Sequence, residues 1–230
     1  MYLSRVRVAT EGLDRRKLLS LLHGDAYSNH QLLWRLFSDD SRRSFLFRQE
    51  TETEQVRLGV EPRGLPLFYV LSESRPVAVP GLLDAESKPF SPVLMTGDRL
   101  TFRLRANPTV TRKTEAGRSV RHDVLMDAKT RCRQQGGDGP EDVRQKMEEA
   151  AIHWLADRSA KAGFTLEGIP QVTAYRQHAK TRKGADIRFS SLDYEGVLKV
   201  TDLDLFNQTL RQGLGKSKAF GCGLMMVRRA

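Results

Sequence analysis

The sequence predicts an α+β protein built from two tandem ferredoxin-like domains, each with the RRM-like element order β-α-β-β-α-β. The second half of the 230 residues shows this order in full, and the first half begins in the same way with β-α-β-β. Between the halves, residues 74–92 contain four prolines and one glycine, and prolines at this density end regular secondary structure. We therefore expect an N-terminal domain over residues 1–78, a linker over residues 79–92 and a C-terminal domain over residues 93–230.

In the first half, alternating apolar and charged side chains predict a strand over residues 1–9. Two helices should follow, because Asp14 and Asp25 are typical N-cap residues. The first helix is expected to end near residue 22 and the second near residue 37. Three further strands are predicted over residues 44–49, 55–60 and 65–71.

In the second half, Leu100, Phe102 and Leu104 alternate with polar residues and predict a strand over residues 99–107. A basic segment over residues 112–121 shows no such periodicity, and we expect it to be irregular. The remaining elements are a helix over residues 141–162, strands over residues 171–177 and 186–200, a helix over residues 202–212 and a strand over residues 223–228.

The chain is strongly basic, with 38 lysines and arginines against 28 acidic residues and a formal net charge of +10. This excess favours a polyanionic partner, which is either nucleic acid or an anionic membrane surface. No long apolar segment or basic amphipathic helix favours the membrane. Arginine side chains spread along the predicted strands instead, and arginine suits phosphates and bases. Nucleic acid is therefore the expected partner.

Cys132 and Cys222 are the only cysteines, and they lie far apart. No cluster of thiols, imidazoles or carboxylates has the spacing of a metal site, so we expect neither a metal nor a cofactor. Two isolated cysteines fit a reducing compartment. The first eight residues are too charged for a signal peptide, and we therefore expect the protein in the cytoplasm.

A glycine-rich segment with two lysines precedes the last predicted strand. Glycine accepts positive φ and lets a bulky ligand approach the backbone, and lysines add positive charge beside exposed N–H groups. The segment fits a polyanion, although a tight helix-to-strand connection would need the same glycines. It lacks the spacing and the preceding strand of a Walker phosphate loop. The residues expected to bind are Gly213, Gly215, Lys216, Lys218, Gly221 and Gly223.

Tyr27, His30, Trp34 and Phe37 are spaced so that they form one stripe on a helix. One interpretation is a core stripe with a satisfied histidine. The other is catalytic, because a neutral imidazole with a pKa near ~6.5 can accept a proton and return it. A tyrosine beside it can orient the reacting group or share the proton transfer. The sequence leaves both interpretations open.

A basic hairpin is predicted around residues 176–188, where positive side chains could lie along a nucleic acid backbone. A solvated loop is the alternative. The positive residues of this segment are Arg176, Lys180, Arg182, Lys183 and Arg188.

Taken together, these motifs resemble the CasE family, the CRISPR RNA-processing endoribonucleases of type I-E Cascade systems. Four segments carry the resemblance, in the same order as in the family and across nearly the whole chain. They are residues 1–6, the helix from Tyr27 to Phe37, the run from Phe102 to Pro108 and the glycine-rich segment from Gly213 to Leu224.

The resemblance implies a metal-independent endoribonuclease that binds the stem-loop of the CRISPR repeat and cleaves precursor CRISPR RNA at the 3′ base of the stem. Attack by the 2′-hydroxyl would leave 5′-hydroxyl and 2′,3′-cyclic phosphate ends. The enzyme would then stay on this 3′ handle as a Cascade subunit. Its partners would be the repeat RNA and other Cascade subunits, notably the backbone subunit, and no membrane.

By motif position, the resemblance implies that His30 is the catalytic histidine, Tyr27 the active-site tyrosine and Arg35 an assisting basic residue. It places RNA contacts on the glycine-rich segment and the basic hairpin. Arg103 and Arg105, on the strand that carries the third motif, are further expected RNA-binding residues.

Two other functions compete with this interpretation. A non-catalytic RNA-hairpin-binding subunit of a ribonucleoprotein would have the same composition. A metal-dependent nuclease is disfavoured because the carboxylates are scattered.

Overall fold

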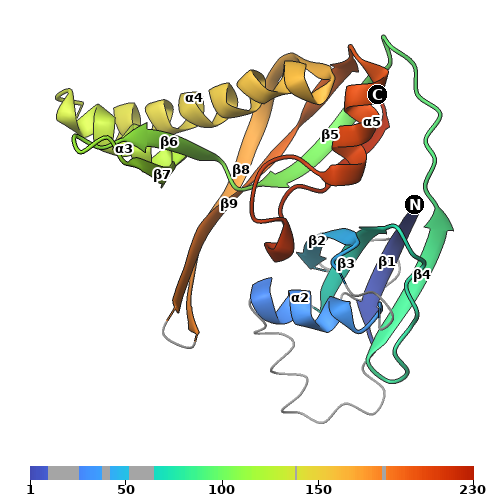
Figure 1. Ribbon diagram of the computed structural model, residues 1–230. Coiled ribbons are helices and arrows are strands. Elements are labelled where there is room, and N and C mark those ends of the chain that lie inside the picture. Colours follow the sequence, from blue (N-terminus) through green and yellow to red (C-terminus); the bar gives the residue numbers. More distant parts are fainter. Residues whose placement is uncertain (10–25, 38–41, 52–64, 138, 183–184) are drawn as a thin grey trace. The chain divides into compact units, whose positions relative to one another are not determined.

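The computed structural model describes residues 1–9, 26–37, 42–51, 65–137, 139–182 and 185–230 (Figure 1). The chain divides into two compact units. Unit 1 consists of Met1–Val93 together with Lys218–Leu224, and unit 2 consists of Leu94–Ser217 together with Met225–Ala230. The C-terminal segment therefore returns to unit 1 before the last strand completes unit 2.

Unit 1 is built on a four-stranded antiparallel sheet with the order β2-β3-β1-β4. The strands are β1 (Tyr2–Val8), β2 (Phe45–Thr51), β3 (Pro66–Ser72) and β4 (Leu83–Pro89). This is the strand order of a ferredoxin-like domain. The helix α2 (Ala26–Trp34) belongs to the same unit, and Leu33 on α2 is fully buried with Val6, Phe68 and Leu83 of the sheet.

The strand β4 differs from the linker expected over residues 79–92. It pairs with β1 along its whole length, from Tyr2 opposite Pro89 to Val8 opposite Leu83. Prolines are tolerated at the ends of strands and on edge strands, and β4 is an edge strand that ends in Pro89. Residues 73–82 between β3 and β4 contain no helix. The helix expected near residues 14–22 and the strand expected over residues 55–60 lie outside the described residues.

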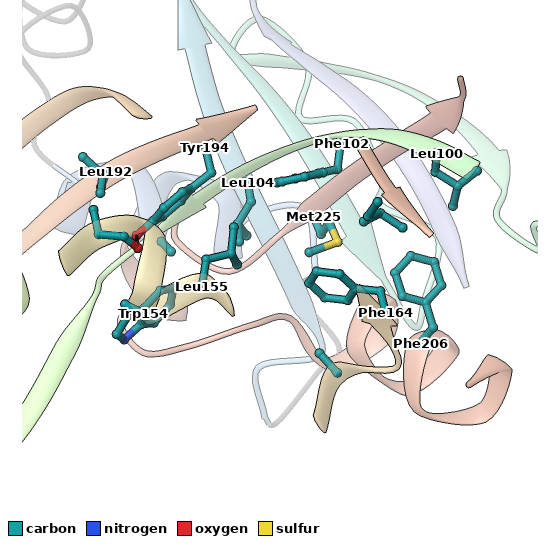
Figure 2. Close-up of a cluster of buried hydrophobic side chains, with 14 of the residues drawn as sticks. Leu100, Phe102, Leu104, Trp154, Leu155, Phe164, Leu192, Tyr194, Phe206 and Met225 are labelled. Atoms are coloured by element: carbon teal, nitrogen blue, oxygen red, sulfur yellow. Dashed lines mark hydrogen bonds between the residues drawn. The ribbon is translucent and has the colours of Figure 1, made fainter. Parts of the chain in front are cut away.

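Unit 2 contains a second four-stranded antiparallel sheet, with the order β10-β5-β9-β8. Its strands are β5 (Arg99–Ala106), β8 (Phe164–Arg182), β9 (Ala185–Val200) and β10 (Met225–Arg229), and its helices are α4 (Pro140–Ser159) and α5 (Leu203–Gln212). In chain order these elements follow β-α-β-β-α-β, whereas the described part of unit 1 follows β-α-β-β-β with the equivalent strand order, and the ferredoxin-like fold is confirmed. Figure 2 shows the core between the sheet and the helices, which includes Leu104, Leu155, Tyr194 and Phe206.

Local signals in the sequence explain the helix boundaries of unit 2. Pro140 starts α4 in its first turn, where a missing N–H costs nothing. A short 3-10 turn, η2 (Ala160–Ala162), follows α4 and ends at Gly163, which has φ of +80°. A Cβ at Gly163 would lie 2.4 Å from the carbonyl oxygen of Asp202, so only glycine fits there. Asp202 caps α5, since its side chain accepts a hydrogen bond of 3.0 Å from the Leu205 N–H.

The basic segment expected to be irregular is an ordered insertion between β5 and α4. It forms a hairpin of β6 (Thr109–Lys113) and β7 (Ser119–Asp123), followed by the helix α3 (Val124–Gln134). Asp123 caps α3 by accepting a hydrogen bond of 2.9 Å from the Met126 N–H. The hairpin was missed because most of its side chains are exposed, and a strand with no buried face lacks the alternation that predicts strands.

The hairpin of β8 and β9 is longer than predicted, because β8 begins at Phe164 rather than near residue 171. Irregular pairing between Glu167 and Gln171 accommodates Gly168 and Pro170 within the strand. Pairing of β5 with β9 ends at Ala106 opposite Leu192, whereas β8 and β9 stay paired beyond it. Residues 176–182 of β8 and 185–191 of β9 therefore form a two-stranded extension, the β8–β9 arm (Figure 1).

Candidate functional site

His30 lies in the second turn of α2, where its ring is half-buried among aromatic side chains of β2. The ring stacks on Phe47 with an interplanar angle of 11° and a centroid distance of 6.3 Å. The Phe45 ring lies 5.8 Å from it. The neighbouring Asn29 is buried, and its side-chain amide donates a hydrogen bond of 2.7 Å to Gln49 on β2. The helix and the strand thus fix the position of the imidazole.

Trp34, one turn further along α2, supplies the polar contact of the His30 ring. Its indole Nε1–H donates a hydrogen bond of 3.1 Å to Nε2 of His30. Burial lowers the pKa of His30 below its ordinary value, and the positive charge of Arg43 lowers it further. The structure therefore holds His30 as a neutral imidazole at neutral pH.

Of the other two residues expected at this site, one shares the face of His30. Tyr27 lies three residues earlier on α2 and is half-buried, so it lies on the same face of the helix. Arg35 is exposed just beyond the end of α2. Five residues correspond to a rotation of about 140° from His30 around a helix, so Arg35 lies on a different face.

The sequence did not indicate that the positive charge of Arg43 acts on His30. Arg43 precedes β2, and residues 43, 45 and 47 alternate in the way that places side chains on one face of a strand. Phe45 and Phe47 both contact His30. This alternation next to a candidate histidine is the signal that could have identified Arg43.

The second half of the glycine-rich segment lies against the same elements as His30. The 3-10 turn η3 (Lys218–Phe220) contacts both α2 and β2 within unit 1. Gly221 follows with φ of +81°, and a Cβ at this position would lie 3.1 Å from the Phe47 ring, the ring on which His30 stacks. The close approach of backbone and ring explains why glycine is present here.

The first half of the glycine-rich segment stays with unit 2. Gly213 ends α5, and Lys216 is exposed. Ser217 has φ of +57°, and its hydroxyl accepts a hydrogen bond of 2.6 Å from the Asn107 side chain. The segment is therefore held at both ends, and the predicted lysines belong to different units: Lys216 to unit 2 and Lys218 to unit 1.

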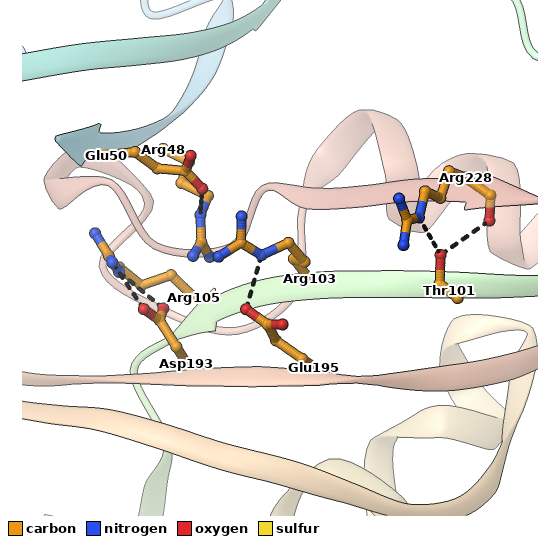
Figure 3. A network of polar contacts seen from close by, with 8 residues as sticks. All are labelled: Arg48, Glu50, Thr101, Arg103, Arg105, Asp193, Glu195 and Arg228. Atoms are coloured by element: carbon orange, nitrogen blue, oxygen red, sulfur yellow. Dashed lines mark hydrogen bonds and ion pairs between the residues drawn. The ribbon is translucent and has the colours of Figure 1, made fainter. Parts of the chain in front are cut away.

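Arg103 and Arg105 are engaged in ion pairs with carboxylates of the adjacent strand β9 (Figure 3). Arg105 binds both oxygens of Asp193 at 2.9 and 2.8 Å, and the pair is largely buried. Arg103 binds Glu195 at 2.7 Å and is half-exposed. These pairs follow from the strand register, which sets Arg103 opposite Glu195 and Arg105 opposite Asp193. Part of the positive charge expected to meet RNA is thus compensated within the sheet.

The β8–β9 arm carries the predicted basic residues and an aromatic pair that the sequence did not reveal. Arg176 and Arg188 are exposed. The His178 ring stacks on Phe189 at 4.4 Å, and its Nε2 lies 2.8 Å from the Ser191 hydroxyl. Lys183 lies outside the described residues, and the side chains of Lys180 and Arg182 are likewise not described.

Asp123 joins the inserted hairpin to the base of the arm. Its carboxylate accepts hydrogen bonds from the hydroxyls of Tyr175 on β8 and Ser190 on β9. Burial, followed by the nearby Asp123 charge, raises the pKa of Tyr175 to about 12. Tyr175 is therefore a hydrogen-bond donor in a structural contact of unit 2.

The described part of the chain bears on metals and membranes through two features, clustered ligand side chains and long apolar helices. No group of three or more histidine, cysteine or acidic side chains gathers there in a way that could hold a metal ion. None of the helices in the described ranges has the length and hydropathy needed to cross a lipid bilayer.

Comparisons with known proteins agree over nearly the whole chain. The family described as "CRISPR associated protein" matches residues 1–229. The "CRISPR system Cascade subunit CasE" of Escherichia coli K12 is 29% identical over 229 residues, which are 99% of this chain and 98% of that protein. The "CRISPR-associated endoribonuclease Cse3" of Thermus thermophilus is 32% identical over 151 residues, which are 61% of this chain and 60% of that protein.

Solved structures give the same result. A structure of the CRISPR endoribonuclease Cse3 bound to a 19-nucleotide RNA has a TM-score of 0.66 at 27% identity and covers 99% of this chain and 100% of its own. The crystal structure of Cas6e from Escherichia coli K-12 has a TM-score of 0.65 at 24% identity and covers 100% of both chains. The second likeness concerns the fold alone.

Proposed function

The chain belongs to the CRISPR associated protein family, and we propose that it is an endoribonuclease that processes precursor CRISPR RNA. It binds the stem-loop of the CRISPR repeat and cleaves at the 3′ base of the stem. It then remains on the RNA as a subunit of type I-E Cascade, beside the backbone subunit and in the cytoplasm. The observation that carries the proposal is the neutral, half-buried His30 on α2, in a chain whose relatives are named endoribonucleases.

The reaction uses the nucleophile that RNA itself contains. The 2′-hydroxyl oxygen attacks the adjacent phosphorus, its proton is removed, and the bond to the 5′-oxygen breaks as that oxygen gains a proton. The products are a 2′,3′-cyclic phosphate and a 5′-hydroxyl. A bound stem holds the junction in line for attack, which supplies the orientation contribution. No step in this scheme requires a metal ion.

His30 and Tyr27 supply the proton transfers and the positioning in this scheme. A neutral imidazole can take the proton of the 2′-hydroxyl and later return it, and such help contributes about 10²–10⁴-fold to the rate. Tyr27 shares the helix face of His30 and orients the phosphate. Lys218 lies on η3, which contacts α2, and its positive charge stabilises the charge that develops on the phosphate oxygens.

Unit 2 supplies much of the affinity for the RNA backbone. Arg176 and Arg188 are exposed on the β8–β9 arm, and the glycine-rich segment places Lys216 in solvent. Contacts between such cations and phosphates dominate affinity and weaken as salt increases. The A-form stem offers a deep, narrow major groove, so recognition by shape and backbone suits this arm.

Incubation of the protein with a synthetic repeat stem-loop in EDTA tests the proposal. We expect one cut at the 3′ base of the stem, with a 2′,3′-cyclic phosphate on the upstream product and a 5′-hydroxyl on the downstream product. A substrate with a 2′-deoxy sugar at the junction should bind equally well and stay intact. Cleavage of the deoxy substrate would contradict attack by the 2′-hydroxyl. Tight binding without any cleavage of the ribose substrate would favour a non-catalytic RNA-hairpin-binding subunit of a ribonucleoprotein instead.

A further inference from the structure

The hydrogen bond between Trp34 and His30 determines the chemical form of the histidine. Tryptophan carries only an N–H donor and has no acceptor nitrogen. Because Trp34 Nε1 lies 3.1 Å from His30 Nε2, Nε2 must present a lone pair and cannot carry a proton. A neutral imidazole with an unprotonated Nε2 carries its proton on Nδ1. The contact therefore selects one of the two neutral tautomers and disfavours the imidazolium ion.

The indole that makes this contact is itself held in place. The Trp34 ring meets the Phe45 ring edge to face, with centroids 5.6 Å apart. Phe45 in turn stacks on the buried Phe37 at 4.8 Å. Trp34 and His30 are four residues apart on α2, the spacing at which helical side chains meet. The donor is thus fixed by packing, independently of the histidine.

We propose that Trp34 is the positioning residue of His30, holding its ring neutral, with the proton on Nδ1, through the indole hydrogen bond to Nε2. This inference rests on the proposed function only where it concerns cleavage. Nε2 is then the basic nitrogen of the ring, and it is occupied by Trp34 in the free protein. To accept the proton of the 2′-hydroxyl at Nε2, the histidine exchanges the indole N–H for the hydroxyl as the RNA binds.

The charged and titratable groups around His30 do not supply the same effect. Tyr27 lies on the same helix face, Arg43 precedes β2, and Lys218 lies on η3. Arg48 and Glu50 pair with each other at 3.0 Å in a buried position on β2, offset by an odd number of residues from Phe45 and Phe47 and so on the opposite face. Neither Arg43 nor Lys218 can act as Trp34 does, because a charge disfavours the imidazolium without choosing the nitrogen that keeps the proton. Only a directed donor at Nε2 selects the tautomer.

Trp34→Phe removes the donor and keeps an aromatic ring against Phe45. A hydrogen bond to the neutral form favours that form, so its loss should raise the pKa of His30. We expect the protonation constant of His30 to increase about 2- to 10-fold, the value of a typical net hydrogen bond. The matched control is Trp154→Phe at the only other tryptophan, whose indole N–H donates to the Thr109 carbonyl oxygen in unit 2. This variant should leave the His30 signals in place.

Nitrogen-15 NMR of the histidine rings in the RNA-free protein measures the tautomer and the pKa directly. In the wild type, His30 should show a protonated Nδ1 and an unprotonated Nε2 at about pH 7.5, which lies above the lowered pKa of the ring; this measurement needs no variant. In Trp34→Phe, the tautomer preference should weaken and the titration should move to higher pH. A protonated Nε2 in the wild type, or a titration unchanged by Trp34→Phe, would overturn the inference.

Cleavage measurements complete the test. When the single-turnover rate is plotted against pH, the inflection that reports the pKa of His30 should move to higher pH in Trp34→Phe. This holds whether the histidine acts as base or acid. RNA affinity should not fall, because Trp34 acts through His30 and the variant removes a hydrogen bond that RNA binding would otherwise break. The two proposals fail separately: a wild type that cleaves nothing refutes the proposed function, whereas the NMR result decides the role of Trp34 without RNA.

Discussion

In unit 1 the side chain of His30 is surrounded by aromatic rings and is half-buried, whereas in unit 2 the β8–β9 arm carries solvent-exposed arginines. A half-buried imidazole has a lowered pKa and a fixed orientation, which suit proton transfer. Exposed guanidinium groups present planar sets of hydrogen-bond donors to the solvent, which suit contact with phosphates. Burial thus separates the two tasks, so substitutions in the two regions should affect different measured quantities.

The largest expected effect comes from removing the imidazole. His30→Ala should lower the single-turnover cleavage rate by about 10²–10⁴-fold, because the described residues around α2 offer no second histidine to replace it. Affinity for the stem-loop should be unchanged, since His30 is neutral and contributes no charge to RNA binding. Single-turnover kinetics and filter binding measure the two quantities separately.

The control for this prediction is His153→Ala, in which an exposed histidine on α4 loses a weak contact of 3.4 Å with Asp157. Its rate and affinity should match those of the wild type. Loss of rate and affinity together in His30→Ala would instead indicate a packing role for His30, and the contrast between the two regions would disappear.

A smaller effect is expected where the glycine-rich segment meets the aromatic rings. Gly221→Ala places a non-glycine residue at a φ of +81° and a Cβ 3.1 Å from the Phe47 ring. The left-handed conformation costs about 1–2 kcal/mol, and a shift of Phe47 also disturbs the ring stacked on it. We expect a lower melting temperature from the strained backbone and a lower cleavage rate from the displaced Phe47 and His30 rings; a tenfold loss of rate would correspond to ~1.36 kcal/mol on the barrier.

Gly117→Ala separates these two consequences. Gly117 also has positive φ, at +73°, but a Cβ there would meet no atom within 4 Å. The variant should lose stability to a similar extent and keep the wild-type cleavage rate. Equal loss of rate in both variants would show that Gly221 acts through global stability and not through Phe47 and His30.

In the β8–β9 arm, charge removal should change the salt dependence of binding. The double variant Arg176→Gln, Arg188→Gln should reduce the slope of log affinity against log salt by about 0.7–0.9 for each phosphate contact that is lost. The cleavage rate at saturating protein should not change. Binding isotherms between low and physiological salt measure the slope. Arg144→Gln is the control, because Arg144 is exposed on α4 and already paired with Glu141 at 2.6 Å; an equal change in this variant would point to net charge alone.

The two regions also differ in how far the sequence alone could describe them. The spacing of Tyr27 and His30 placed both on one helix face, because helical periodicity is a local property. The hydrogen bond from Trp34 could not be predicted, since spacing does not fix the direction of an indole N–H. Arg103 and Arg105 were predicted as RNA contacts, but their ion pairs with β9 depend on strand register. Register is set by contacts between residues distant in the sequence, which composition and spacing do not contain.

The same reasoning applies to the fold. Alternation and N-caps predicted the strands and helices that have a buried face, such as β5 and α5. The inserted hairpin of β6 and β7 was missed because most of its side chains are exposed. Strand β4 was missed because Pro89 at its end is compatible with an edge strand only once the sheet order is known.

The smallest effect should come from the positive charge of Arg43, which lowers the pKa of His30. Burial is the main cause of this lowering, and Arg43 is the second. Removing the charge in Arg43→Gln favours the imidazolium, so the pKa of His30 should rise and the inflection of the cleavage rate should move to higher pH. Because Arg43 is the second cause and the burial of the ring is retained in the variant, the shift should be small. The neighbouring variant Arg42→Gln removes the same charge from an exposed residue that lies 3.8 Å from Glu73. In this variant the inflection of the pH–rate profile should stay at the wild-type pH. An equal shift in both variants would mean that His30 responds to the net charge of unit 1 and not to Arg43 in particular.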